Sequence, residues 1–226
     1  MHWDLPDRAS TYAADIDWIF YLIAAITIII FAIVSVALAY FLWKYRGRPG
    51  RKAHYTHGNV HAEVIWTAIP AIIVVSLALL SARVWSQVKD PDRFPADALP
   101  IRVDAKQFEW HFTYPGADGV PGNEDDFSVR NALHVPVDRP VRLTLHAEDV
   151  IHSFFVPEFR IKQDAVPGLE IPVWFEATKT GEYELACAEL CGLGHYRMRA
   201  VVTVHTAESY EAWLASGGAQ APAADD

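Results

Sequence analysis

Residues 18–43 read WIFYLIAAITIIIFAIVSVALAYFLW and contain no charged side chain. This run exceeds the roughly 20 apolar residues that a helix needs to cross a bilayer. A second uncharged segment covers residues 64–82, and Trp or Tyr side chains flank both segments, as is typical of membrane–water interfaces. Nothing else in the 226-residue chain is large enough to bury both segments in a soluble core. We therefore predict a transmembrane helical hairpin over residues 18–88, with helices at about 18–43 and 63–85.

The linker between the two segments is basic, with Lys44, Arg46, Arg48, Arg51 and Lys52. Loops that remain in the cytoplasm carry an excess of Lys and Arg, so we place this linker on the cytoplasmic side. The N-terminal segment 1–17 and everything after the second helix are then extracytoplasmic. The N-terminus lacks a basic region and a small-residue cleavage motif, so we expect no cleavable signal peptide.

From about residue 99 the sequence changes to short alternating runs of apolar and polar residues. The alternation shifts phase near Lys106 and Gln107, which suggests a β-bulge or a change of partner sheet. Further strands are expected at 141–146, 171–177, 183–187 and 200–204, separated by turns rich in Pro and Gly. This pattern predicts a β-sandwich over residues 99–215. Thr206 is suited to cap a short helix through Leu214, and the small, polar tail 216–226 is expected to be disordered.

The turn from Pro115 to Phe127 holds four acidic residues among glycines. Such a loop could bind a cation, but it does not match the spacing of an EF-hand. A solvated acidic hairpin is the simpler interpretation.

The chain concentrates soft metal ligands near its C-terminus, in the stretch CAELCGLGHYRM at residues 187–198. Cys187 and Cys191 are the only cysteines, and Met198 is the only methionine besides Met1. Together with His195 and the upstream His152 they form a set that favours copper, because sulfur donors suit Cu(I) and imidazole holds either oxidation state.

Three interpretations of the two cysteines compete. A disulfide suits an oxidising outer compartment, although so small a ring constrains little. A mononuclear blue-copper site needs one Cys, two His and one Met, and leaves a cysteine over. A dinuclear copper centre, with both thiolates bridging the metals, uses every soft ligand present.

These motifs resemble subunit II of the haem-copper cytochrome c oxidases. The resemblance is carried by Cys187-x-Glu189-x-Cys191-Gly-x-x-His195-x-x-Met198, by Glu148-Asp149-Val-x-His152-Ser, by Glu63-x-Ile-Trp66-Thr-x-x-Pro70 and by Lys162-Gln-Asp164-Ala-Val-Pro167-Gly168. It covers nearly the whole chain. It implies a membrane-anchored all-β protein, in which the two-helix hairpin precedes a cupredoxin-like β-sandwich.

The resemblance also implies roles for individual residues. Cys187 and Cys191 are expected to bridge two copper ions, with His152 and His195 as terminal ligands. Met198 and the backbone carbonyl of Glu189 are expected as axial ligands.

Two acidic side chains receive further roles from the resemblance. The Glu189 side chain is expected to point toward a magnesium ion at the boundary with subunit I. Glu63 matches the glutamate near the start of a proton-uptake route on the cytoplasmic side.

The sequence departs from the family in places. Where relatives commonly have a tryptophan through which electrons reach the metal, this chain has Phe108, followed by Trp110 in the same strand. Leu169 follows Pro167-Gly168 where many relatives carry arginine. The 115–126 insert resembles the bacterial caa3-like branch, whose subunit II often has a fused cytochrome c domain. No Cys-x-x-Cys-His motif is present, so we expect no covalent haem in this chain.

The sequence thus predicts the electron-accepting subunit of a proton-pumping cytochrome c oxidase in the plasma membrane of a bacterium. Its expected partners are subunit I and other oxidase subunits, a cytochrome c donor and the lipid membrane, with no nucleic acid. The net charge of −9 would favour a basic donor, through Glu148, Asp149, Glu158 and Glu189. The alternative is a membrane-anchored copper chaperone or thiol-redox assembly factor. Among the other histidines, four are expected to be structural (His111, His134, His146, His205) and three to lie near the linker (His54, His57, His61).

Overall fold

The computed structural model describes residues 4–116, 119 and 121–218. The chain divides into two compact units, one formed by Asp15–Trp85 and the other by Met1–Ala14 with Ser86–Asp226. Of the tail predicted to be disordered, residues 219–226 lie outside the described residues.

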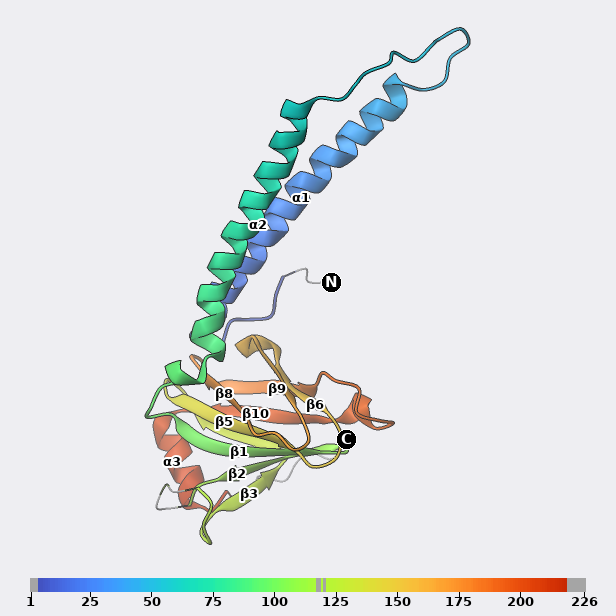
Figure 1. Cartoon of the computed structure of the whole chain (residues 1–226). Helices are drawn as coiled ribbons and strands as arrows, with labels where there is room; N and C mark the ends of the chain where they lie inside the picture. The colour runs from blue at the N-terminus through green and yellow to red at the C-terminus, as the bar shows by residue number, and fades with distance from the viewer. Residues whose placement is uncertain (1–3, 117–118, 120, 219–226) are drawn as a thin grey trace. The chain divides into compact units, whose positions relative to one another are not determined.

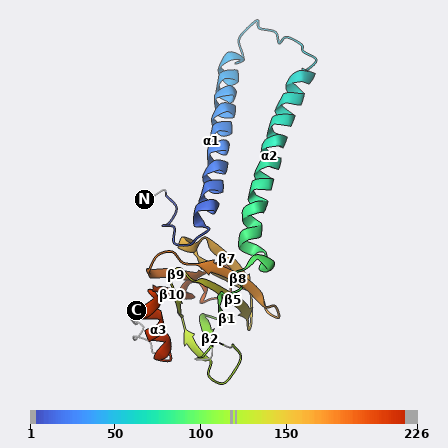
Figure 2. The same ribbon diagram turned by 90° about the vertical axis from the view of Figure 1, so that its left-hand side faces the viewer.

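The helical hairpin consists of α1 (Ala13–Lys44) and α2 (Val60–Lys89), which run antiparallel in Figures 1 and 2. Both are long and apolar enough to cross a membrane, and none of their most apolar stretches is buried within the protein. Large apolar side chains such as Phe31, which is 71% exposed, therefore face outward. Asn59 begins α2 by accepting a hydrogen bond from the Ala62 backbone N–H at 3.1 Å. Pro70 lies inside α2 without ending it, which neighbouring groups permit in a membrane.

The second unit is a sandwich of two five-stranded sheets (Figure 1). One sheet has the order β3-β2-β1-β5-β8 and the other β4-β10-β9-β6-β7. The strands are β1 (Leu99–Lys106), β2 (Glu109–Tyr114), β3 (Phe127–Arg130), β4 (Ala132–Pro136), β5 (Pro140–Ala147), β6 (His152–Val156), β7 (Ile161–Ala165), β8 (Ile171–Glu176), β9 (Gly181–Cys187) and β10 (Arg199–His205). The fold is therefore the predicted one, two apolar helices followed by a β-sandwich.

The core lies between the sheets and follows the period of two along the strands. In β1, Ile101, Val103 and Ala105 are buried. In the neighbouring strand β2 their paired residues Phe112 and Trp110 are buried as well. The phase shift near residue 107 reflects neither a bulge nor a change of sheet, contrary to our expectation. Gln107 and Phe108 form a two-residue turn between β1 and β2, with Lys106 paired to Glu109. In this hairpin odd-numbered residues of β1 pair with even-numbered residues of β2. The buried residues are therefore odd-numbered in β1 and even-numbered in β2.

An N-terminal strap, residues 6–12, joins the sandwich. The Ala9 N–H donates to the Glu158 carbonyl at 3.0 Å, and the Thr11 N–H donates to the Glu176 carbonyl at 3.1 Å. The buried hydroxyl of Ser10 donates to the Phe159 carbonyl at 2.8 Å. The segment that precedes the first membrane helix is thus part of the folded domain.

The short helix α3 (Ala207–Ala215) closes one end of the sandwich. Thr206 caps it as predicted, since its hydroxyl accepts from the Ser209 N–H at 3.3 Å. Trp213 of α3 stacks on His134, with ring centroids 4.4 Å apart. His134 is in turn hydrogen-bonded to His205 across a ring nitrogen distance of 2.8 Å.

Candidate metal centre

Two loops at one end of the second sheet supply the soft ligands. β9 ends at Cys187, and the chain returns through a short 3₁₀ turn, His195–Arg197, to begin β10 at Arg199. The Cys187 N–H donates to the Met198 carbonyl at 3.0 Å, which closes this ligand loop at its base. The second loop joins β5 to β6, and His152 is the first residue of β6. Because Phe154 of β6 pairs with Cys187 of β9, the register brings His152 to the same end of the sheet.

The predicted ligands converge. The Sγ atoms of Cys187 and Cys191 lie 3.9 Å apart. His152 Nδ1 lies 4.0 Å from the Cys187 sulfur, and His195 Nδ1 lies 3.7 Å from the Cys191 sulfur. The Met198 sulfur is 3.7 Å from that of Cys191.

The backbone carbonyl oxygen of Glu189 also points into the cluster, at 3.2 Å from the Cys187 sulfur. The Glu189 side chain itself is exposed. One loop thus supplies a carbonyl to the cluster and presents a carboxylate outside it.

The two cysteines are free rather than joined. Their separation is well beyond the roughly 2.05 Å of a disulfide bond. Donors that share one metal at a little over 2 Å lie about 3–4 Å from each other in a tetrahedral arrangement. The spacing of these donors therefore matches that of ligands around a metal.

The site is largely shielded from water. His152 is fully buried, and Cys187, Cys191 and Met198 are at most 7% exposed. His195 is half-buried at the rim. The loop tip is apolar and open to solvent, because Leu193 is 97% and Tyr196 86% exposed. A buried, soft-ligand pocket under an apolar rim suits a metal that exchanges electrons without meeting water.

The two thiols differ electrostatically. Burial opposes ionisation of Cys187, but the hydrogen bond with His152 and nearby backbone groups outweigh it, so that its pKa is lowered to about 6. Burial and the charge of Cys187 raise the pKa of Cys191. Two thiolates this close repel each other unless a cation lies between them.

Both predicted aromatic residues lie next to the ligand loops. Phe108 is half-buried in the β1–β2 turn, and its ring lies directly against the backbone of Gly194. Trp110 is fully buried, and its ring meets that of His152 edge-on at 6.2 Å. Trp110 therefore belongs to the core, as expected from its alternation, and also touches a ligand.

The other predicted residues lie elsewhere. Glu63 is exposed in the first turn of α2, in the other compact unit. Glu158 lies in the 3₁₀ turn that follows β6, at the end of that strand opposite His152. Asp149 is tied by hydrogen bonds to His152 and Gln107 and is not a free surface charge.

The histidines expected to be structural are engaged in hydrogen bonds outside the cluster. His111 pairs with Glu109 at 2.8 Å, and His146 pairs with Asp104 at 3.0 Å. His134 pairs with His205, as described above. None of these four belongs to the group of His and Cys donors that gathers around Cys187 in the described part of the chain.

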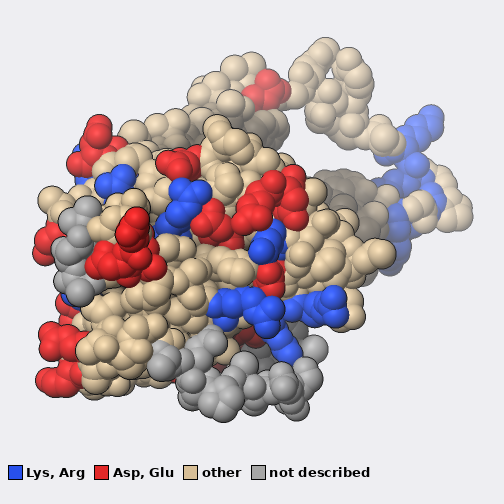
Figure 3. Space-filling model, turned by 90° about the horizontal axis from the view of Figure 1, so that it is seen from below, with Lys and Arg blue, Asp and Glu red and all other residues tan. Residues whose placement is uncertain are grey.

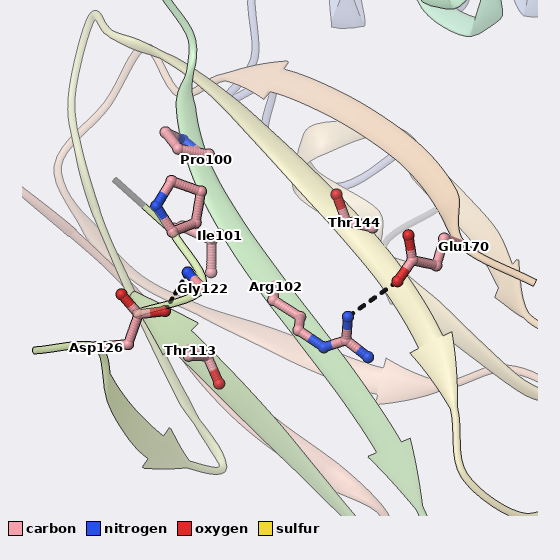
Figure 4. Close-up of a pocket in the computed structure, with 9 residues that line it drawn as sticks. Pro100, Ile101, Arg102, Thr113, Gly122, Asp126, Thr144 and Glu170 are labelled. Carbon is pink, nitrogen blue, oxygen red and sulfur yellow. Dashed lines mark hydrogen bonds and ion pairs between the residues drawn. The ribbon is translucent and has the colours of Figure 1, made fainter. Parts of the chain in front are cut away.

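A second pocket in the described part of the sandwich differs in its chemistry. A shallow pocket on the outer face of the first sheet is spanned by an ion pair of Arg102 and Glu170 at 3.0 Å (Figure 4). Its remaining labelled side chains carry no soft metal ligand (Figure 4). On the face shown in Figure 3, acidic clusters adjoin a band of basic side chains, so the net negative charge is not uniform there.

Comparison with known proteins agrees with this architecture. Residues 104–205 match the family model of the cytochrome c oxidase subunit II periplasmic domain. Residues 1–84 match the model of its transmembrane domain. The chain belongs to the cytochrome c oxidase subunit II family.

Individual relatives are similar over most of their length. Cytochrome c oxidase subunit 2 of Thermostichus vulcanus is 34% identical, over 94% of this chain and 78% of the relative. The corresponding protein of a Synechocystis species is 33% identical, over 98% of this chain and 77% of the relative. The crystal structure of the periplasmic domain of Bradyrhizobium japonicum cytochrome oxidase subunit II is 31% identical, with a TM-score of 0.48, over 54% of this chain and 95% of that one.

This subunit II is thus anchored in a membrane by two helices and carries an extracytoplasmic C-terminal domain. The strap independently indicates that the chain crosses the membrane twice. It precedes α1, yet pairs with residues that follow α2, so both flanks of the hairpin lie on one side of the membrane.

Proposed function

We propose that this subunit holds a dinuclear copper centre and passes electrons from a cytochrome c to haem in subunit I of an oxidase. The ligands are His152, Cys187, Cys191, His195 and Met198, with the Glu189 carbonyl. The observation that carries the proposal is the convergence of these donors, from two loops, at 3.2–4.0 Å from a cysteine sulfur.

The donor set fits two copper ions better than one. A single blue-copper ion needs one cysteine, two histidines and a weak methionine. Here each cysteine sulfur has its own histidine and its own weak donor, the Glu189 carbonyl beside Cys187 and the Met198 sulfur beside Cys191. The arrangement is therefore nearly symmetric about the sulfur pair, as two bridged metals require.

A bound copper pair supplies reversible one-electron chemistry. The chain holds the ligands in place and keeps water out. The ligand loop is closed at its base by the hydrogen bond from the Cys187 N–H to the Met198 carbonyl, and the Ser153 backbone carbonyl accepts from the Ala188 N–H at 3.0 Å. Ligands held in this way would keep the coordination of bound copper similar in both oxidation states and so lower the reorganisation needed for each transfer.

Phe108 and Trp110 are the aromatic residues through which electrons would reach copper bound at this site. Phe108 lies against Gly194 at the surface, and Trp110 touches His152 from the core. A donor docked over the apolar tip formed by Leu193 and Tyr196 comes within a few side chains of the ligands.

At the level of the complex, we propose oxygen reduction to water and proton pumping in partner subunits, in the plasma membrane of a bacterium. The Glu189 carboxylate, which is exposed, is proposed to help bind magnesium at the boundary with subunit I. Glu63, exposed in the first turn of α2, is proposed to feed protons into an uptake route. An ionisable group at a membrane helix commonly has such a role.

The decisive experiment loads the full-length chain, in detergent, with copper. We expect two coppers per chain and a seven-line EPR pattern from an electron shared by two equivalent nuclei. Cys191→Ser should abolish this signal, while His111→Asn, outside the cluster, should keep it. One copper with a four-line pattern would contradict the dinuclear site. A cysteine pair that cycles between thiol and disulfide without retaining copper would instead support the assembly factor.

The donor is tested by stopped-flow mixing of the assembled oxidase with reduced cytochrome c at several salt concentrations. We expect the rate of electron uptake to fall with salt if charged groups steer the encounter. A salt-independent rate would remove the electrostatic part of the proposal.

A further inference from the structure

Asp149 uses both of its carboxylate oxygens, one within the His152 loop and the other on the β1–β2 turn. Its Oδ1 lies 2.8 Å from His152 Nε2 and accepts from the Val150 N–H at 2.7 Å. Its Oδ2 accepts from the Gln107 backbone N–H at 2.8 Å. A carboxylate only accepts, so Nε2 of His152 carries a hydrogen, and Nδ1 is the ring nitrogen that would face a metal beside Cys187.

Gln107 continues this connection to the second loop. Its side-chain Nε2 donates to the Cys191 carbonyl at 2.5 Å. Gln107 therefore donates two hydrogen bonds. Its backbone N–H donates to the His152 loop, and its side chain donates to the Cys191 loop. A continuous path of hydrogen bonds runs from His152 through Asp149 and Gln107 to Cys191.

The glycines of the ligand loop make this close approach possible. A Cβ at Gly192 would lie 2.7 Å from Gln107 Nε2, and one at Gly194 would lie 2.4 Å from the Phe108 ring. Gly192 also has φ of +133°, which disfavours any other residue. The ligand loop is thus shaped to sit against the Gln107–Phe108 turn.

Resting on the proposed copper centre, we propose that Asp149 and Gln107 form a positioning bridge that fixes the two ligand loops relative to each other. The bridge sets the ring orientation of His152 and the position of Cys191. Neither residue touches the metal. Hydrogen bonds behind metal ligands of this kind typically change metal affinity by about 10–100-fold when they are removed.

The bridge makes a specific demand on Asp149. Asparagine at this position can accept on one side only, because its amide nitrogen is a donor. Asp149→Asn therefore loses either the contact to His152 or the contact to Gln107. Gln107→Leu keeps the backbone contact to Asp149 and removes only the donor to Cys191.

Asp104 offers a matched control. It pairs with His146 at 3.0 Å, much as Asp149 pairs with His152, but outside the metal cluster. Asp104→Asn alters a comparable carboxylate–imidazole pair in the same domain, together with the ion pair of Asp104 with Arg102 at 2.9 Å. Any effect that is general to such a loss will appear in this variant as well.

The test measures copper affinity of the full-length chain in detergent, by competition with a chelator, together with the EPR spectrum and the thermal unfolding of the copper-free form. We expect Asp149→Asn and Gln107→Leu each to weaken copper binding by about 10–100-fold and to alter the hyperfine splitting. Asp104→Asn should leave both unchanged. Because either change breaks the same bridge, the copper affinity of the double variant should be about that of the single variant that binds copper less tightly. It should not fall by the product of the two separate fold-losses in affinity.

The outcomes separate the two proposals. A wild-type chain that holds no copper pair overturns both. A wild-type chain that binds two coppers, with unchanged affinity in Gln107→Leu or with fully additive losses in the double variant, overturns the bridge alone. Gln107 is exposed, so its variant decides the matter even where Asp149→Asn fails to fold.

Discussion

Gly194→Ala tests how tightly the ligand loop lies against the β1–β2 turn. The added Cβ would lie 2.4, 2.6 and 2.8 Å from Cδ2, Cγ and Cε2 of the Phe108 ring. Carbon atoms in contact prefer about 3.5–4.0 Å, so the ring must withdraw by about 1 Å. Gly194 has φ of −91°, which alanine adopts freely, so the backbone adds no strain. Overpacking of this kind costs about 1–3 kcal/mol.

The assay is thermal unfolding of the extracytoplasmic domain in the full-length, copper-free chain, followed by near-ultraviolet circular dichroism. The expected loss corresponds to a decrease in Tm of about 3–10 °C for a domain of this size. Gly47→Ala is the control, because nothing lies within 4 Å of a Cβ at that position. Adding Phe108→Ala to Gly194→Ala removes the obstructing ring and should lessen the effect of the added methyl group. An unchanged Tm in Gly194→Ala, or no coupling between the two positions, would refute the steric argument.

Three further predictions use the same unfolding assay. Burial and a neighbouring imidazole lower the pKa of His134 to about 4, so the unfolded chain binds the proton more readily. Stability should therefore fall by about 1–2 kcal/mol as the pH drops from about 6.5 towards 4, allowing for solvent screening at this half-buried site. His134→Phe, which retains a ring against Trp213, should reduce that pH dependence, and an identical profile would contradict the assignment. Ser10→Ala leaves a backbone carbonyl without its buried hydroxyl donor and should cost about 1–2 kcal/mol, whereas Ser128→Ala on an exposed strand position should cost little. Leu193→Ala should change stability by less than about 0.5 kcal/mol, since this side chain is 97% exposed, and a larger loss would mean that the loop tip is packed.

The sequence predicted the elements whose signal is local. The uncharged run at 18–43 is enough to identify a membrane helix, and the alternation of Ile101, Val103 and Ala105 identifies β1. The strands β3, β4, β6 and β7 were not predicted. They are only four or five residues long, and β4 and β6 depend for their pairing on the distant strands β10 and β9.

The candidate metal site was likewise predicted where its residues are close in sequence and missed where they are brought together only by the fold. The two cysteines, His195 and Met198 are close in sequence, and His152 joins them only through the β6–β9 register. The roles of Asp149 and Gln107 were missed, since they depend on the β1–β2 turn meeting both loops. The one available signal was an aspartate three residues before His152. The phase shift at Gln107 marked that turn but was misinterpreted, because periodicity alone does not separate a hairpin from a bulge.

The N-terminal strap has a consequence for the order in which the chain is made. Ser10 and the carbonyl that it binds on Phe159 are 149 positions apart. At a synthesis rate of about 5–20 residues per second, the strap emerges roughly 7–30 s before its partner exists. During that time both membrane helices and most of the sandwich strands must still be translated. The strap is therefore translated before either membrane helix but is secured only after residues 158–177 have been exported.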